Sequence, residues 1–179
     1  MARIVTYNVH RCLGTDAILT HLPERLVRAG ALPTLRGVRG LETRGALWAA
    51  IDVDGVEVQV INTHLGLVPR EQRAQARALA GDRWLADPAC VGPTILTGDF
   101  NCTSLTRPYA ALTRRLSDAQ RLLKLRPSVK TFPSAFPAIR IDHFFVSREV
   151  TPLSIHAPLS PLARAASDHL PLVMDFSLK

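Results

Sequence analysis

The stretch Thr94-Ile95-Leu96-Thr97-Gly98-Asp99-Phe100-Asn101 joins a short apolar run to polar residues that follow it directly. Residues 94–97 are predicted to form a buried strand, because the run is rich in β-branched side chains and too short for a typical helix. Asp99 and Asn101 then stand at the end of that strand, where a sheet holds side chains rigidly at its rim. A lone acid at a strand end is more often a turn former than a functional group. The stretch therefore predicts a functional site only if other strands end in the same way.

Polar residues of catalytic type follow apolar strands at three other places in the chain. These places are Tyr7-Asn8-Val9, Asn62-Thr63-His64-Leu65 and Ser167-Asp168-His169. Taken singly, an asparagine there serves as a strand cap, and a histidine is more often a satisfied structural residue. Their recurrence in chain order favours one site that is assembled from several strand ends.

The strands themselves are predicted from short apolar and β-branched runs. Residues 3–9, 141–146 and 170–176 have this character. Between Leu47 and Thr63, two apolar runs flank Asp54-Gly55, a pair that tolerates the positive φ angles of a type I′ turn. The sequence therefore predicts an antiparallel hairpin around that pair.

Helices are predicted between the strands, over Arg70 to Leu85 and over Pro108 to Leu125, where apolar residues recur at helical spacing. Trp84 and Tyr109 belong to these apolar stripes, so we expect them in the core and not at a ligand. Residues 11–44 contain scattered glycines and prolines with only short apolar pieces, and they resist assignment.

Composition sets broad limits on the chain. Its 179 residues, 47% of them hydrophobic, suffice for one well-buried core, so residues 1–179 are predicted to form a single domain. The formal charge of +7 favours polyanionic partners, although arginines that merely solvate helix faces explain it equally well.

Three cysteines without ligand spacing argue for a reducing compartment. No apolar run approaches the roughly eighteen residues of a membrane span, and no signal peptide is evident, so a cytoplasmic protein is expected.

Five short motifs, read in chain order, resemble the signature series of the endonuclease/exonuclease/phosphatase superfamily. They are Tyr-Asn-Val, Thr-His-Leu, Gly-Asp-Phe-Asn, Ile-Asp-His and Ser-Asp-His-Leu-Pro. That superfamily includes pancreatic-type deoxyribonucleases, abasic-site endonucleases, sphingomyelinases and inositol-polyphosphate phosphatases. The resemblance implies an α/β (α+β) fold: a four-layered sandwich of two packed, mostly antiparallel sheets flanked by helices, here with one sheet reduced.

The same resemblance implies a chemical role for several of the motif residues. Asp99 would orient or deprotonate the attacking water, and Asn101 would donate to the phosphate. His169 would act on the phosphoryl oxygens or as general base, with Asp142 holding its ring in one tautomer. His64 would be a second imidazole, placed for the leaving group.

A metal ion is also implied. Asn8 and Asp168 would lie on or beside Mg²⁺ or Mn²⁺, since Mg²⁺ prefers hard oxygen ligands and retained waters.

His143 follows Asp142 directly and would point to the opposite face of its strand, which favours a structural role.

The chain departs from the superfamily at one principal metal ligand, a Glu that normally ends the second strand. The acids before the hairpin are Asp16, Glu24 and Glu42, and none follows a buried-strand pattern. The chain therefore resembles an internally shortened member that lacks a helix and the Glu-bearing strand. We expect a weakened metal site and an exposed sheet edge that a homodimer would cover. The rival hypothesis is that one of those three acids replaces the missing ligand.

These observations favour a divalent-metal-dependent phosphodiesterase, a nuclease that hydrolyses DNA or RNA with little sequence specificity. Two alternatives stay open: a phospholipid or small-molecule phosphodiesterase or phosphatase, and a catalytically weakened remnant that binds nucleic acid or a partner protein. Assays on several phosphodiesters would separate the first two, and binding without turnover would indicate the third.

Overall fold

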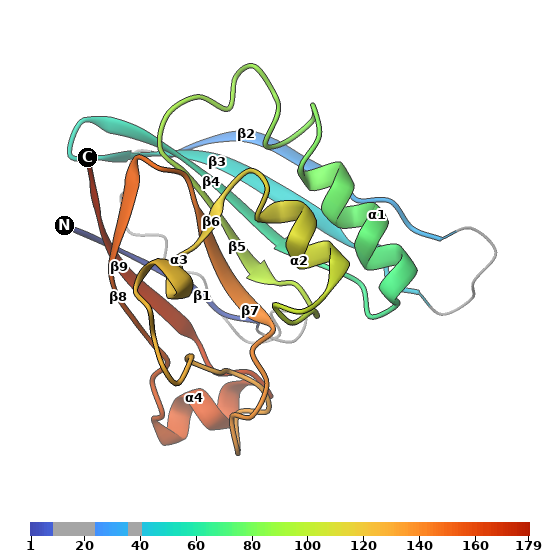
Figure 1. The fold of residues 1–179 in the computed structure, drawn as a ribbon, viewed down its shortest axis with the longest axis vertical. Coiled ribbons are helices and arrows are strands. Elements are labelled where there is room, and N and C mark those ends of the chain that lie inside the picture. The colour runs from blue at the N-terminus through green and yellow to red at the C-terminus, as the bar shows by residue number, and fades with distance from the viewer. Residues whose placement is uncertain (9–23, 36–40) are drawn as a thin grey trace.

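Two β-sheets pack face to face in the computed structural model of this chain, which describes residues 1–8, 24–35 and 41–179 (Figure 1). The smaller sheet joins, in this spatial order, β1 (Ala2–Thr6), β9 (Leu172–Leu178) and β8 (Val150–His156). The larger sheet joins β2 (Glu24–Ala31), β3 (Gly45–Val53), β4 (Val56–His64), β5 (Thr94–Asp99), β7 (Asp142–Val146) and β6 (Ser117–Asp118). Among the described residues only β4 and β5 pair in parallel. The predicted sandwich of mostly antiparallel sheets, with one sheet reduced, is confirmed.

The hairpin predicted around Asp54-Gly55 is also confirmed. Both residues have positive φ, 55° and 83°, as the turn type requires. The turn fixes the register of β3 and β4, in which Ala46 faces Thr63. That register matters for the site, because β4 ends at His64.

Helices α1 (Pro69–Leu79) and α2 (Arg107–Leu112) pack together on the outer face of the larger sheet (Figure 1). The predicted helix over 70–85 is too long, since α1 ends at Leu79 and the chain continues in turns, with Gly81 close behind the end. Trp84 lies in these turns and is buried, as expected for a core residue. None of the helices in the described ranges is long and apolar enough to cross a membrane.

The prediction of one helix over 108–125 is wrong. Strand β6 interrupts it, and α3 (Ala119–Leu122) is a separate short helix. The physical reason is Asp118, whose backbone pairs with β7 and whose side chain accepts hydrogen bonds from two backbone N–H groups of α3. Arg140 donates to the same carboxylate from a distant part of the chain. Helix α4 (Pro161–Ala166), and strands β2 and β8, were not predicted.

Side-chain alternation divides the larger sheet between two apolar cores. One core lies beneath α1 and α2 and includes Ile61, Leu96 and Phe145. The other lies between the sheets and includes Val58, Ile95 and Phe144. In a strand, successive side chains point to opposite faces, so the position of any residue of β4, β5 or β7 follows from these assignments.

Candidate active site

Three neighbouring strands of the larger sheet have polar residues in one row at the same edge of the sheet, where β4 and β5 end and the antiparallel β7 begins. His64 on β4 pairs with Asp99 on β5, and Asp99 pairs with Asp142 on β7. Each of the three lies an even number of residues from a side chain of the core between the sheets. Alternation therefore directs all three side chains to the space between the sheets, at its open end.

The smaller sheet brings two further residues to the same place. Asn8 follows β1 closely, and His169 precedes β9. The Asn8 side-chain amide donates to Oδ2 of Asp99 at 2.9 Å. Nε2 of His169 lies 3.6 Å from the same Asp99 oxygen. Residues from the two sheets thus meet at one carboxylate.

The imidazole of His169 is held in one orientation. Its Nδ1 lies 2.8 Å from Oδ2 of Asp142, and the hydroxyl of Thr131 donates to that oxygen at 2.5 Å. The ring of Phe132 packs against His169 at 4.9 Å between centroids. Burial alone would lower the pKa of His169, but the hydrogen bond and charge of Asp142, with the charge of Asp99, outweigh it and raise the pKa. Nδ1–H is therefore the donor to Asp142, and Nε2 faces Asp99.

His64 has the opposite electrostatic setting. Burial, the Arg44 guanidinium and the nearby His169 lower the pKa of His64 to about 4. Nη1 of Arg44 lies 3.2 Å from Nδ1 of His64, and a guanidinium can only donate, so Nδ1 is the acceptor. Nε2 then carries the hydrogen and lies 3.3 Å from Oδ2 of Asp99. At neutral pH His64 is therefore an uncharged donor.

Asp99 is buried at the centre of this arrangement. Burial, followed by the charge of Asp142, raises the pKa of Asp99 to about 6, although the backbone N–H of Asn101 and the amide of Asn8 stabilise the carboxylate. A carboxylate with a raised pKa close to neutral accepts a proton more readily than an ordinary aspartate. The position suits a general base.

Gly98 explains how Asp99 reaches its place. Its φ is 136°, and a Cβ atom there would lie 1.8 Å from the carbonyl oxygen of Thr63 on β4. Only glycine permits this close pairing immediately before Asp99. The glycine of the Gly-Asp-Phe-Asn motif thus has a steric reason.

Two predicted site residues are less central. The Asn101 side-chain amide donates to the carbonyl oxygen of Leu65 at 2.9 Å, so one of its two N–H groups already anchors the loop after β4. Asp168 is exposed beside His169. Its neighbour Ser167 donates through its hydroxyl to the backbone oxygen of Asn8 at 2.5 Å, which ties the two strand ends together.

The donor set fits a hard divalent cation in part. Ligand atoms of Asp99, Asp142 and His169 lie within 4.8 Å of one another. The Asp142 oxygen, however, already accepts from His169 and Thr131, so it serves hydrogen bonding better than metal binding. The carboxylates of Asp99 and Asp168 and the amide oxygen of Asn8 supply the remaining hard donors, and Mg²⁺ needs only one or two carboxylates besides water.

The acids considered as a substitute for the missing Glu have different outcomes. Asp16 lies outside the described residues, and of Glu24 only the backbone, at the start of β2, is described. Glu42 pairs with Arg44 at 3.0 Å, and Arg44 in turn contacts His64. Glu42 therefore reaches the site through Arg44.

Sequence reasoning missed Arg44 and Thr131, which both contact site residues. Arg44 could have been found, because the hairpin register, continued past Ala46 and Thr63, places position 44 beside the end of β4. Thr131 has no comparable signal, since it lies in an irregular segment and reaches Asp142 only through the tertiary fold.

Comparison with known proteins gives a family match. A family model described as the Endonuclease/Exonuclease/phosphatase family matches residues 6–169, which is most of the chain. The chain is also 30% identical over 148 residues to the uncharacterised protein YbhP of Escherichia coli (strain K12). That match covers 79% of this chain and 55% of YbhP, so the chain spans about half the length of this curated relative.

Solved structures show the same fold. The endonuclease/exonuclease/phosphatase from Bacteroides vulgatus matches with a TM-score of 0.67 at 23% identity, over 87% of this chain and 67% of that one. Mannosyl-6-phosphatase of Bacteroides thetaiotaomicron matches with a TM-score of 0.68 at 20% identity, over 87% and 67%. TDP2 of D. rerio, solved with a single strand DNA product, matches with a TM-score of 0.63 at 17% identity, over 86% and 68%. At such identities the likeness concerns the fold alone.

Proposed function

The chain belongs to the endonuclease/exonuclease/phosphatase family, and we propose that it is a divalent-metal-dependent phosphodiesterase that hydrolyses DNA or RNA with little sequence specificity. Members of the family are generally hydrolases of phosphoester bonds. The single observation that carries the proposal is the convergence of His64, Asn8 and His169 on one buried Asp99 carboxylate oxygen. Hydrolysis of a phosphodiester needs a base for water, donors for the phosphoryl oxygens and help for the leaving oxygen, and this cluster contains all three kinds of group.

Asp99 acts as the base in this proposal. It orients a water molecule and accepts its proton as the water oxygen attacks phosphorus. The Asn8 amide fixes the carboxylate in place at 2.9 Å, and the backbone N–H of Asn101 holds its other oxygen at 2.8 Å. A base that is held in position before the reaction needs no reorganisation during it.

The two histidines have separate tasks. His169, with its raised pKa and its ring fixed by Asp142, presents Nε2–H to the phosphoryl oxygens and can release a proton to the departing oxygen. His64 is uncharged, and its Nε2–H points toward Oδ2 of Asp99. It can therefore donate a hydrogen bond at the reaction centre without changing its charge. Asp142 is a positioning residue, because it acts through His169.

The proposed cation is Mg²⁺ or Mn²⁺, with Asn8 and Asp168 as its protein ligands beside Asp99. When bound, such an ion supplies positive charge that neutralises the phosphoryl group. Since the Glu-bearing strand has no counterpart among the described residues, we expect weaker metal binding than a site with that extra carboxylate would give.

Nucleic acid is the proposed substrate for two reasons. The formal charge of +7 attracts a polyanion. A protein of the same fold, TDP2, has been solved with a single strand DNA product. A small phosphoester is the second candidate, because mannosyl-6-phosphatase also shares the fold.

The test is hydrolysis of plasmid DNA, RNA, bis(p-nitrophenyl) phosphate and mannose 6-phosphate by the wild type, each with Mg²⁺, with Mn²⁺ and with a chelator. We expect metal-dependent cleavage of the nucleic acids and a rate lower by about 10²–10⁴ for His169→Ala. His156→Ala is the matched control, since that exposed histidine lies at the end of β8, and it should keep the wild-type rate. Hydrolysis of mannose 6-phosphate alone would favour the second candidate, and no turnover of any substrate would refute the proposal.

We also propose a homodimer that forms along β1. This strand is an edge of the smaller sheet as described, and Val5 on it is 52% exposed. A hollow of about 680 Å³ beside it is lined by apolar side chains of β1 and β3, among them Ile4 and Ile51. A strand edge with an exposed apolar side chain favours pairing with a second copy. Sedimentation should show a dimer that Val5→Lys dissociates and Val56→Lys does not, whereas a monomer at high micromolar concentration would remove the idea.

A further inference from the structure

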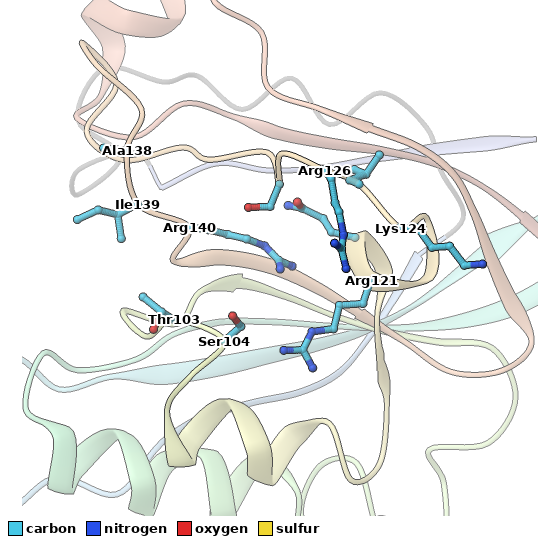
Figure 2. Close-up of a pocket in the computed structure, with 11 residues that line it drawn as sticks. Thr103, Ser104, Arg121, Lys124, Arg126, Ala138, Ile139 and Arg140 are labelled. Atoms are coloured by element: carbon cyan, nitrogen blue, oxygen red, sulfur yellow. The ribbon is translucent and has the colours of Figure 1, made fainter.

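A basic hollow of about 810 Å³ lies between the segment that follows β5 and the segment that precedes β7 (Figure 2). Hydroxyl and cationic side chains dominate its lining, and the residues that matter are Thr103, Ser104, Arg121, Lys124, Arg126 and Arg140. In Figure 2 the two hydroxyl residues lie on one side of the hollow, with Arg126 and Arg140 on the other. None of the described residues that line it is acidic.

Two residues that line the hollow, Thr103 and Arg140, stand in the chain a few residues beyond the ladder between β5 and β7. Asp99 and Asp142 are the last paired residues of that ladder, and the N–H of Phe100 donates to the carbonyl oxygen of Ile141 just beyond them. Thr103 and Arg140 follow on the two diverging chains. Two residues of extended chain span about 7 Å, so Arg140 lies at roughly that distance along the backbone from Asp142.

Arg140 forms a fixed wall of the hollow. Its Nη2 donates to both carboxylate oxygens of the buried Asp118 at 2.7 Å, and Tyr109 donates to the same carboxylate through its hydroxyl at 2.5 Å. Arg121 lies over the ring of Tyr109 at 4.9 Å. The charge of Arg140 is therefore balanced within the fold.

Lys124 and Arg126 are the two cations of the lining whose charge is available to a ligand. Both side chains are exposed, and neither forms an ion pair with any residue of the described ranges. Two exposed cations beside hydroxyl donors, with no acid among the described lining residues, suit a phosphate group. Since none of the described residues that line the hollow is aromatic, these residues offer contacts to the backbone of a strand and no stacking surface for its bases.

We propose that this hollow binds the phosphate next to the scissile one in a nucleic-acid strand. The inference rests on the proposed function, because it takes the scissile phosphate to lie at Asp99 and His169. The strand passes from the acid cluster, across Thr103 and Ser104, to Lys124 and Arg126. Contacts with the backbone alone give affinity without sequence preference.

The first test is binding of a fluorescein-labelled single-stranded DNA in EDTA, so that no turnover is required. The double variant Lys124→Gln/Arg126→Gln should bind about tenfold more weakly at low salt, and the slope of log K against log salt should fall by about 1.4. The matched control is Arg77→Gln/Arg114→Gln, which removes the same charge from exposed arginines at a separate hollow between α1 and α2. The control should bind like the wild type. Equal losses in both double variants, or none in either, would overturn the subsite.

The second test compares kcat/KM for a single-stranded oligonucleotide with kcat/KM for bis(p-nitrophenyl) phosphate, which has a single phosphate. The ratio should fall about tenfold in Lys124→Gln/Arg126→Gln and stay at the wild-type value in the control. An unchanged ratio in an active double variant contradicts the subsite. A wild type that cleaves no phosphodiester refutes the proposed function instead, and the binding measurement then decides the subsite by itself.

Discussion

Asp142 and His143 are neighbours on β7, yet they lie in two different regions of the molecule. Asp142 faces the space between the sheets and contacts His169. His143 faces the core beneath α1 and α2, where it is 0% exposed. One strand therefore supplies a residue to the candidate site on one face and a packing residue on the other. Adjacent titratable residues of one motif can therefore have separate tasks.

Aromatic rings surround the side chain of His143, and its imidazole makes one hydrogen bond to the backbone. Its Nε2 lies 2.8 Å from the carbonyl oxygen of Cys102, and the rings of Phe100, Tyr109 and Phe145 surround it at 5.4 to 5.6 Å between centroids. Its Nδ1 has no partner within the described part of the chain. Burial, followed by the charge of Arg140, lowers the pKa of His143 to about 4. His143 is thus a neutral structural residue, as its place in the sequence predicted.

The largest expected effect is a loss of kcat in a variant of Asp142. Asp142→Asn should lower kcat by about 10²–10⁴, because an amide no longer holds His169 in the required tautomer. KM should change much less, since Asp142 would not touch the substrate. The free energy of unfolding should fall by about 1 kcal/mol or less. Steady-state kinetics measures kcat and KM, and urea unfolding of the same preparation measures the free energy of unfolding. An increase in KM at constant kcat would argue against a positioning role.

The next effect concerns the packing region. His143→Phe should destabilise the protein by about 1–3 kcal/mol at neutral pH, because the carbonyl oxygen of Cys102 loses its buried donor. The kcat of the folded variant should stay within about threefold of wild type. Urea unfolding checks the first statement, and a loss of activity comparable to that of Asp142→Asn would disprove the separation of the two regions.

The stability of His143→Phe relative to the wild type should also depend on pH. The folded pKa of His143, about 4, lies below the value of about 6.5 for an exposed histidine, so the unfolded chain takes up the proton first as the pH falls. The stability that neutral His143 confers is therefore present above about pH 6.5 and is lost as the pH falls toward 4. Asp118 and Asp142 favour its protonated form and Arg140 opposes it. The stability difference between wild type and His143→Phe should shrink by up to about 3 kcal/mol between about pH 7 and about pH 4. A difference that is constant over this range would mean that the histidine titrates normally.

The smallest expected effect on kcat concerns Thr131, which contacts Asp142 and not the substrate. Thr131→Val removes the hydroxyl that donates to the Asp142 carboxylate, and it should reduce kcat about fivefold, in line with roughly 1 kcal/mol for one hydrogen bond. The control is Thr113→Val, because the Thr113 hydroxyl donates to carbonyl oxygens of α2 and contacts no residue of the candidate site within the described part of the chain, and it should keep the wild-type rate. Equal rates for the two variants would show that Thr131 does not support the site.

Local patterns in the sequence predicted much of this arrangement. The strand over 141–146 and its alternation placed Asp142 and His143 on opposite faces, because side-chain period depends only on local backbone geometry. The Asp54-Gly55 turn predicted the hairpin that brings His64 to the end of β4. These features rest on neighbours in the chain, which the sequence displays directly.

Features that depend on distant partners were missed. Residues 108–125 have helical periodicity, but the pairing of Asp118 with β7 and Arg140 breaks the helix. The contact of Thr131 with Asp142 likewise exists only in the folded chain. Whether residues 1–179 form the whole of one domain stays a prediction.

The separate roles of Asp142 and His143 can be tested by measuring kcat/KM on single-stranded DNA and the free energy of unfolding for Asp142→Asn and His143→Phe side by side. We predict a crossed result, in which the first variant loses about 10²–10⁴ in kcat/KM with nearly wild-type stability, and the second loses stability with nearly wild-type kcat/KM. If both variants lose activity and stability in the same proportion, Asp142 is a structural residue like its neighbour, and the proposed active site is contradicted.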